Sequence, residues 1–186
     1  MATNKVNLGI GNASGMAFHA PANTAAPAYP GASLAGTDWE EIGAISEDGI
    51  SYGLNYSKDA IRNWALEIER LKNSDGDATI QAPFIDTTEE VFNTLFGEDN
   101  VTVTAATTSH GKLISVEIGP DTQTEGEAFL FLMKDGDDMI SVYTPKGFIT
   151  SVDDIDFAPD DAITWNATIS SKSWTVTKDD GQVTSL

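Results

Sequence analysis

The sequence has 186 residues, with 29 Asp and Glu against 10 Lys and Arg, which gives a formal net charge of −19. A surface this acidic repels nucleic-acid phosphates and argues against recognition of DNA or RNA through a basic patch. The absence of cysteine excludes disulfides, cysteine-based zinc sites and thiol nucleophiles. Hydrophobic residues make up 40% of the chain, which suits one domain with a substantial core. We find no apolar run of the roughly 18 residues that a membrane helix needs and no secretory signal, so we expect no membrane contact.

The first part of the chain differs in composition from the rest. Residues 1–37 contain no Asp or Glu and hold three of the seven prolines, in a stretch rich in Ala, Pro and Gly without a usable period. Such a stretch is typical of a segment that is disordered alone or ordered by a neighbouring molecule. We therefore predict an extended N-terminal arm over residues 1–36 and a β-domain over residues 37–186.

Short strand patterns separated by turn residues follow the arm. They predict a mainly β fold, an antiparallel β-sandwich or barrel with one short α-helix. One continuous apolar run, 128–133, is typical of a strand buried on both faces. Turn residues at 135–137 and 145–147 separate the strands around it. The predicted strands lie at 50–56, 78–84, 101–107, 112–118, 128–133, 139–143, 148–152, 163–169 and 174–177.

The helix is expected at about 87–96. Thr87 and Glu90 have the spacing of a capping box, which places Thr87 at the N-cap. Four apolar residues between 91 and 96 then lie on one helical face, and Gly97 suits a C-terminal cap.

The segment 58–72 fits two patterns. Ile61, Trp64, Ile68 and Leu71 have helical spacing, whereas Trp64, Leu66 and Ile68 have strand spacing. The local pattern alone favours a helix, because the helical period is longer and the residues have good helix propensity.

No group of residues indicates catalysis. The two histidines, His19 and His110, have no acid or nucleophile at a motif spacing, and we interpret both as surface residues. The carboxylates single out no pair of the kind that a glycosidase uses. We therefore predict that the protein is not an enzyme and assign no catalytic, cofactor-binding or metal-binding residues.

Two features leave alternatives open. The acidic clusters at 75–77, 135–138 and 153–156 invite a calcium site, but an EF-hand starting at Asp135 fails because Met139 and Ile140 occupy its fifth and sixth positions. We interpret the clusters as solvated turns, with calcium sites between neighbouring turns as the alternative. The four tryptophans are expected to be core or interface anchors, with a sugar-binding platform on Trp165 and Trp174 as the alternative.

Several segments occur in an order that resembles the major tail-tube proteins of siphophages. They are 39–43, 45–50, the segment around Trp64, the 80–84 strand, the helix start at 86–88, the helix end at 95–97 and the C-terminal run 155–164. The resemblance implies a β-sandwich flanked by a helix. It also implies that 58–84 forms two long strands, so we replace the helix over 58–72 with a hairpin that turns at 73–77.

The resemblance further implies a structural virion protein. Such subunits form stacked hexameric rings through their hairpins, around a tape-measure protein and later around passing DNA. The expected partners are other copies of the chain, the tape-measure protein, the tail terminator and the baseplate, and the expected place of synthesis is the host cytoplasm. We expect an acidic lumen, and ring-to-ring contacts from residues 1–36 or from a 40–57 loop.

Two other readings remain open. One is another virion β-protein, such as a head decoration or tail-terminator subunit. The other is a secreted carbohydrate-binding β-sandwich that uses its tryptophans as a platform.

Overall fold

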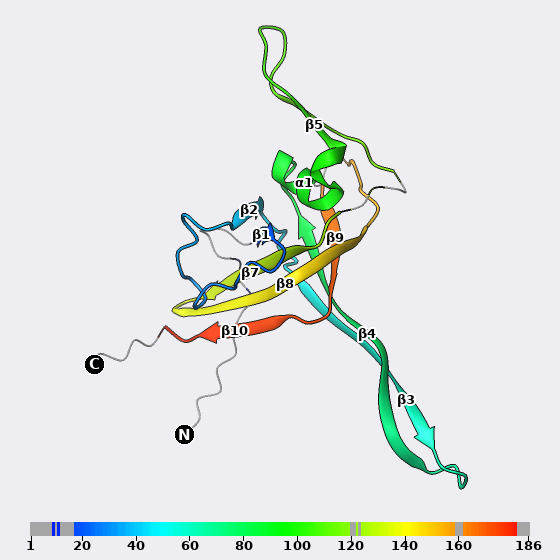
Figure 1. The fold of residues 1–186 in the computed structure, drawn as a ribbon. Coiled ribbons are helices and arrows are strands. Elements are labelled where there is room, and N and C mark those ends of the chain that lie inside the picture. Colours follow the sequence, from blue (N-terminus) through cyan, green and yellow to red (C-terminus); the bar gives the residue numbers. More distant parts are fainter. Residues whose placement is uncertain are drawn as a thin grey trace.

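The computed structural model describes residues 9, 11, 17–119, 122, 124–158 and 162–181. It is mainly β and antiparallel with one α-helix in this part of the chain, which confirms the predicted fold class. The main sheet has eight strands in the order β2-β1-β7-β8-β9-β4-β3, with β10 paired to β8 (Figure 1). These strands are β1 (Ala17–Pro21), β2 (Glu40–Gly43), β3 (Ser51–Arg62), β4 (Ile68–Phe84), β7 (Glu127–Asp135), β8 (Asp138–Val152), β9 (Trp165–Ser171) and β10 (Thr175–Asp179). A separate two-stranded sheet pairs β5 (Val101–Thr104) with β6 (Leu113–Val116).

Strand β7 is buried on both of its faces, as its continuous apolar run predicts. Phe129 and Phe131 point into the main core, which α1 (Glu89–Phe96) covers together with β4 and β9. Leu130 and Leu132 point into a second, smaller core beneath Trp39. The sheet is therefore packed on two sides around β7, which gives the fold its sandwich-like layering.

The N-terminal stretch contributes a strand to this sheet. β1 pairs with both β2 and β7, so 17–21 is an internal part of the body. The segment after it is tied down by two bonds of 2.7 Å, from Tyr143 Oη to the Thr24 carbonyl and from Asn23 N to the Pro145 carbonyl. Within the 1–36 stretch, the residues from 17 onward thus lie on the body. Residues 1–8, 10 and 12–16 lie outside the described residues, and an arm there remains a prediction.

The helix is confirmed, but its N-cap is Thr88 and not Thr87. Thr88 Oγ1 accepts a hydrogen bond from Val91 N at 3.4 Å, and the helix ends at Gly97, whose φ is +83°. The Thr87 hydroxyl instead accepts the indole N–H of Trp165 at 3.1 Å. A mostly buried Trp requires an acceptor, and this tertiary demand decides which threonine caps the helix. A 3-10 turn, η1 (Glu98–Asn100), follows.

The two strands predicted at 139–143 and 148–152 are one strand, β8, so the predicted turn at 145–147 is wrong. Thr144 pairs with Phe129 and Gly147 pairs with Glu127, which leaves two residues of β8 opposite Ala128. Pro145 therefore lies in a β-bulge, where a residue without an N–H is tolerated inside a strand.

Candidate assembly surface

The β3–β4 hairpin projects from the body as a two-stranded ribbon (Figure 1). Residues 78–84 of β4 pair with β9, and 78–81 of them also pair with β3, whereas 68–77 pair only with β3 among the described strands. The hairpin predicted by the family resemblance is therefore present, and the helix suggested by local periodicity over 58–72 is wrong.

The position predicted for its turn is also wrong. The chain turns at 63–67, and the cluster 73–77 lies inside β4. There the register moves from Tyr56 opposite Gly76 to Lys58 opposite Asn73, so β4 carries an extra residue. Residues that favour turns also favour β-bulges, and here the cluster forms a bulge within a longer strand.

Asn63 builds the observed turn. Its Oδ1 accepts hydrogen bonds from Ala65 N at 2.9 Å and Glu67 N at 3.0 Å, and its carbonyl accepts one from Leu66 N at 3.0 Å. Leu66 has a φ of +65°, a left-handed conformation that costs a non-glycine residue about 1–2 kcal/mol. An Asn that can start an Asx turn was the sequence signal for this position.

One face of the ribbon is apolar and exposed. Residues paired across antiparallel strands share a face, so Tyr52 and Leu54 lie on the side of Ile80 and Ala78, which are buried in the body. We call the exposed continuation of this side the outer apolar face. It consists of Tyr52, Leu54, Tyr56 and Leu71, whose exposed fractions are 53%, 57%, 63% and 53%.

The hairpin tip adds two more apolar side chains. Trp64 is fully exposed and Leu66 is 74% exposed. Exposed apolar side chains gathered on one side of a ribbon, with an aromatic residue at its tip, are typical of a protein–protein contact.

The opposite face of the sheet is mostly polar, with Phe148 and Ile61 as exposed apolar side chains on it. Short hydrogen-bonded side chains cross from strand to strand, with Ser51 Oγ 3.3 Å from Gln81 Oε1 and Thr150 Oγ1 3.2 Å from Ser170 Oγ. We call this the polar face, and it includes Ser51, Asn55, Asp77, Thr79, Gln81, Thr150, Asn166, Thr168 and Ser170.

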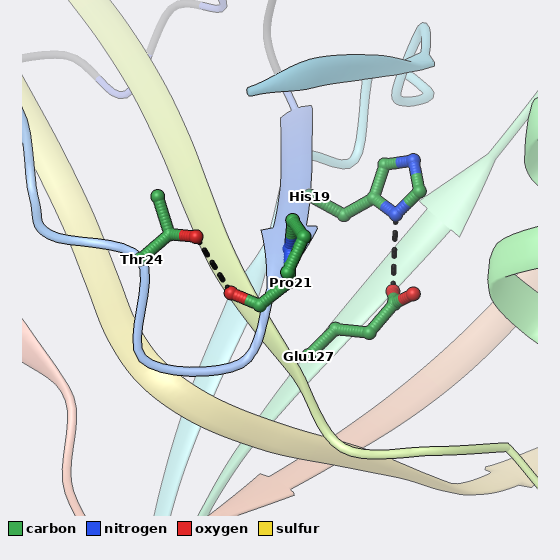
Figure 2. Close-up of polar contacts among 4 residues, drawn as sticks. All are labelled: His19, Pro21, Thr24 and Glu127. Carbon is green, nitrogen blue, oxygen red and sulfur yellow. Dashed lines mark hydrogen bonds and ion pairs between the residues drawn. The ribbon is translucent and has the colours of Figure 1, made fainter. Parts of the chain in front are cut away.

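The histidines have different surroundings. His110 is exposed, as expected, but the expectation that His19 lies on the surface is wrong. The His19 side chain is only 13% exposed, and its Nδ1 lies 3.0 Å from Glu127 Oε2 (Figure 2). Burial alone would lower the pKa of His19, but the hydrogen bond and charge of Glu127, with the charges of Glu40 and Glu90, raise it. Burial raises the pKa of Glu90, and the charge of Glu40 raises it further.

The acidic clusters are partly structural. Asp138 is buried and forms an ion pair with Lys178 at 2.9 Å, so it is not a solvated turn residue. Asp153 accepts a hydrogen bond from Asn166 at 2.6 Å. Asp77 accepts one from Ser170 at 3.4 Å.

Three of the four tryptophans are packed into the body. Trp39 and Trp165 are 8% and 4% exposed, and the indole N–H of Trp174 donates to the Ala78 carbonyl at 3.0 Å. A sugar-binding platform needs open indole faces, so the alternative platform on Trp165 and Trp174 does not fit the structure. Trp64 is the tryptophan left open, at the tip of the hairpin.

A β-sheet body with a projecting amphipathic ribbon is typical of proteins that associate through their sheet surfaces. The chain matches the model of the family described as phage tail tube protein over residues 1–173, and it belongs to that family. No curated protein matches it. Membership makes it a structural component of a phage tail and confirms the resemblance seen in the sequence. Among the described residues, no helix is long and apolar enough to span a membrane.

Proposed function

We propose that the protein is the major tail-tube subunit of a siphophage and assembles into hexameric rings that stack into a tube. The observation that carries this proposal is the outer apolar face, which continues the buried side of β4 beyond the body. A single subunit leaves this face in water, and a neighbouring copy would bury it. Burial of apolar surface stabilises association by about 25 cal/mol per Å² before the costs of ordering are subtracted.

In this arrangement the ribbons of neighbouring subunits pair side by side. The ribbon has a free strand edge along β3, whose only strand partner among the described residues is β4. Unpaired backbone N–H and C=O groups on such an edge add a strand from the next subunit. The contact is heterologous, because one edge of a ribbon binds a different edge of the next. Repeated by rotation around a ring, it joins the ribbons into a closed barrel.

The polar face then lines the lumen, because the opposite side of the sheet faces the core and the neighbour. Its groups are mostly hydroxyls and amides, with Asp77 as an acid among them. We therefore replace the acidic lining expected from the sequence by a largely neutral hydroxyl and amide lining at these strands. The hydroxyls and amides carry no fixed charge, although Lys72 and Arg70 lie on this side of the outer ribbon, opposite Asp59 and Ile61. The net charge of −19 adds long-range repulsion, so that DNA passes without being held.

The other expected partners are part of the same proposal. A tape-measure protein would occupy the lumen before the DNA, while a tail terminator and a baseplate would cap the two ends. Synthesis would take place in the host cytoplasm. Ring-to-ring contacts would use the N-terminal residues before β1 or the 44–50 connection. The 40–57 segment is not a single loop, because β2 and the start of β3 lie within it.

Electron microscopy of the purified full chain tests the proposal. The wild-type protein is expected to form tubes or stacked rings. The double variant Leu54→Ser, Leu71→Ser removes both leucines of the outer apolar face and is expected to remain a folded single subunit by circular dichroism and light scattering. The matched control is Phe157→Ser, which removes a side chain that is 74% exposed outside the ribbon; it should still form tubes.

Three outcomes would contradict the proposal. Normal tubes from the double variant would show that the ribbon is not the ring interface. A wild-type protein that stays a monomer at high concentration would contradict self-assembly. Isolated rings that never stack would favour a tail-terminator or head-decoration role.

A further inference from the structure

A histidine and two glutamates from three different elements converge at one corner of the body. His19 lies in β1, Glu40 lies opposite it in β2, and Glu90 lies in the first turn of α1. One ring nitrogen of His19 and one carboxylate oxygen from each glutamate all lie within 4.8 Å of one another. Two atoms that each bind one ion at about 2.0–2.2 Å lie at most about 4.4 Å apart, so these three atoms are close to the spacing of a shared ion.

The imidazole of His19 is oriented for such a role. Its Nδ1 is hydrogen-bonded to Glu127 Oε2, which can only accept as a carboxylate, so Nδ1 carries the proton (Figure 2). In the neutral ring this leaves the lone pair on Nε2, on the side of the ring away from Glu127. A histidine held by a carboxylate through one nitrogen and free at the other is the arrangement found at protein metal sites.

The free nitrogen is buried and lacks a partner. His19 Nε2 has no hydrogen-bond partner among the described residues. Two further buried hydroxyls in the same condition, those of Thr94 and Thr124, line the same polar pocket of about 630 Å³ as His19. Buried polar atoms are normally satisfied, so these three atoms need water or another group that the protein chain does not supply.

The charges indicate a cation. Glu40, Glu90 and Glu127 place three carboxylates around a single imidazole. Carboxylates gathered around one imidazole form a donor set with a net negative charge, which attracts a cation. Ca²⁺ and Mg²⁺ prefer sites made only of oxygen atoms, and an imidazole nitrogen favours a transition metal such as Zn²⁺.

We propose that His19, Glu40 and Glu90 bind one divalent transition-metal ion of the Zn²⁺ class. His19 contributes Nε2, each glutamate contributes a carboxylate oxygen, and water from the pocket completes the coordination. Glu127 is a positioning residue that fixes the tautomer of His19. The ion would join the edge strand β2 to β1 and to the start of α1, and this structural role is independent of the proposed ring contacts.

Calorimetric titration of the purified full chain with Zn²⁺ alone, after treatment with a chelator, tests this site. We expect one ion per chain and a melting temperature that rises with the Zn²⁺ concentration. Glu40→Gln is expected to weaken binding at least tenfold, and His19→Ala to abolish it. Glu127→Gln is expected to weaken binding by about 10–100-fold without removing a ligand. Titration with Co²⁺ should give a visible absorption band that His19→Ala removes.

The matched control is Glu41→Gln, which removes an equally exposed charge from the next position of β2, opposite Phe18. It should bind Zn²⁺ as the wild type does. Because Glu40 is exposed, Glu40→Gln remains a fair test if His19→Ala fails to fold. The proposal is overturned if the wild type binds no Zn²⁺, or if Glu40→Gln and Glu41→Gln have equal affinities. Tighter binding of Ca²⁺ than of Zn²⁺ would also overturn it, because His19 would then not be a ligand.

Discussion

The two halves of β4 have opposite surroundings. In the inner half, 78–84, Ile80, Ala82 and Phe84 are fully buried beneath α1 and beside β9. In the outer half, 68–77, Leu71 is 53% exposed although its apolar character is equal. Alternation therefore specifies which side of a strand is apolar, whereas the neighbouring elements decide whether that side is covered.

A similar contrast distinguishes the tip of the hairpin from the helix cap. Both depend on one polar side chain that binds nearby backbone N–H groups, Asn63 at the tip and Thr88 at the cap. The cap serves an element that packs on the core. The tip instead holds Trp64 and Leu66 in water, with Leu66 in a left-handed conformation. Strain retained at an exposed apolar tip is consistent with a role in contacts to another molecule.

The largest expected effect separates the two halves of β4. Phe84→Ala leaves a cavity in the main core and should lower the free energy of unfolding of the single subunit by about 3–5 kcal/mol. Leu71→Ala, in the same strand, should change it by no more than about 0.5 kcal/mol, because that side chain is 53% exposed in the single subunit. Urea denaturation of dilute, unassembled protein measures both. Comparable losses for the two variants would show that the outer half is already packed in a single subunit.

An intermediate effect concerns helix α1, which covers residues 78–84 of β4. Thr88→Ala removes the N-cap of α1 and should cost about 1 kcal/mol, whereas Thr88→Ser keeps the hydroxyl and should cost much less. Urea denaturation measures the change in the free energy of unfolding of the whole subunit. Hydrogen exchange should show faster opening in 78–84 of the alanine variant and little change in 68–77. Equal losses for the alanine and serine variants would rule out the hydroxyl as the cap.

The smallest expected effect concerns the tip. Leu66→Gly relieves the left-handed strain, partly offset by the greater freedom of glycine in the unfolded chain, so the net gain in stability should be about 0.5 kcal/mol. The same change should weaken tube assembly, because an apolar contact is removed. Ala65→Gly is the matched control; its residue lacks a positive φ, so it should give no gain in stability. A stable Leu66→Gly variant that forms tubes as readily as the wild type would remove the tip from the interface.

Local chemistry determined much of this protein. The six-residue apolar run 128–133 in β7 predicted burial on both faces, because successive side chains of a strand point to opposite faces. The helix over 89–96 followed from its apolar face and from the threonines before it, although the sequence placed the cap one residue early. The strands near 50–56, 101–107, 112–118 and 163–169 were also predictable, because alternation and turn residues act over short distances. The order of the matching segments along the chain was enough to recognise the family resemblance.

The tertiary structure decided what depends on distant partners. Pairing between β3 and β4 overrode the helical period of 58–72 and turned the cluster 73–77 into a bulge, since a long ladder of backbone hydrogen bonds outweighs weak local propensity. The indole N–H of Trp165 donates its hydrogen bond to the Thr87 hydroxyl, and the Thr88 hydroxyl caps the helix instead. The site at His19 was invisible in the sequence, because Glu40, Glu90 and Glu127 reach it from three other elements, and only the folding of β1 between β2 and β7 brings them together.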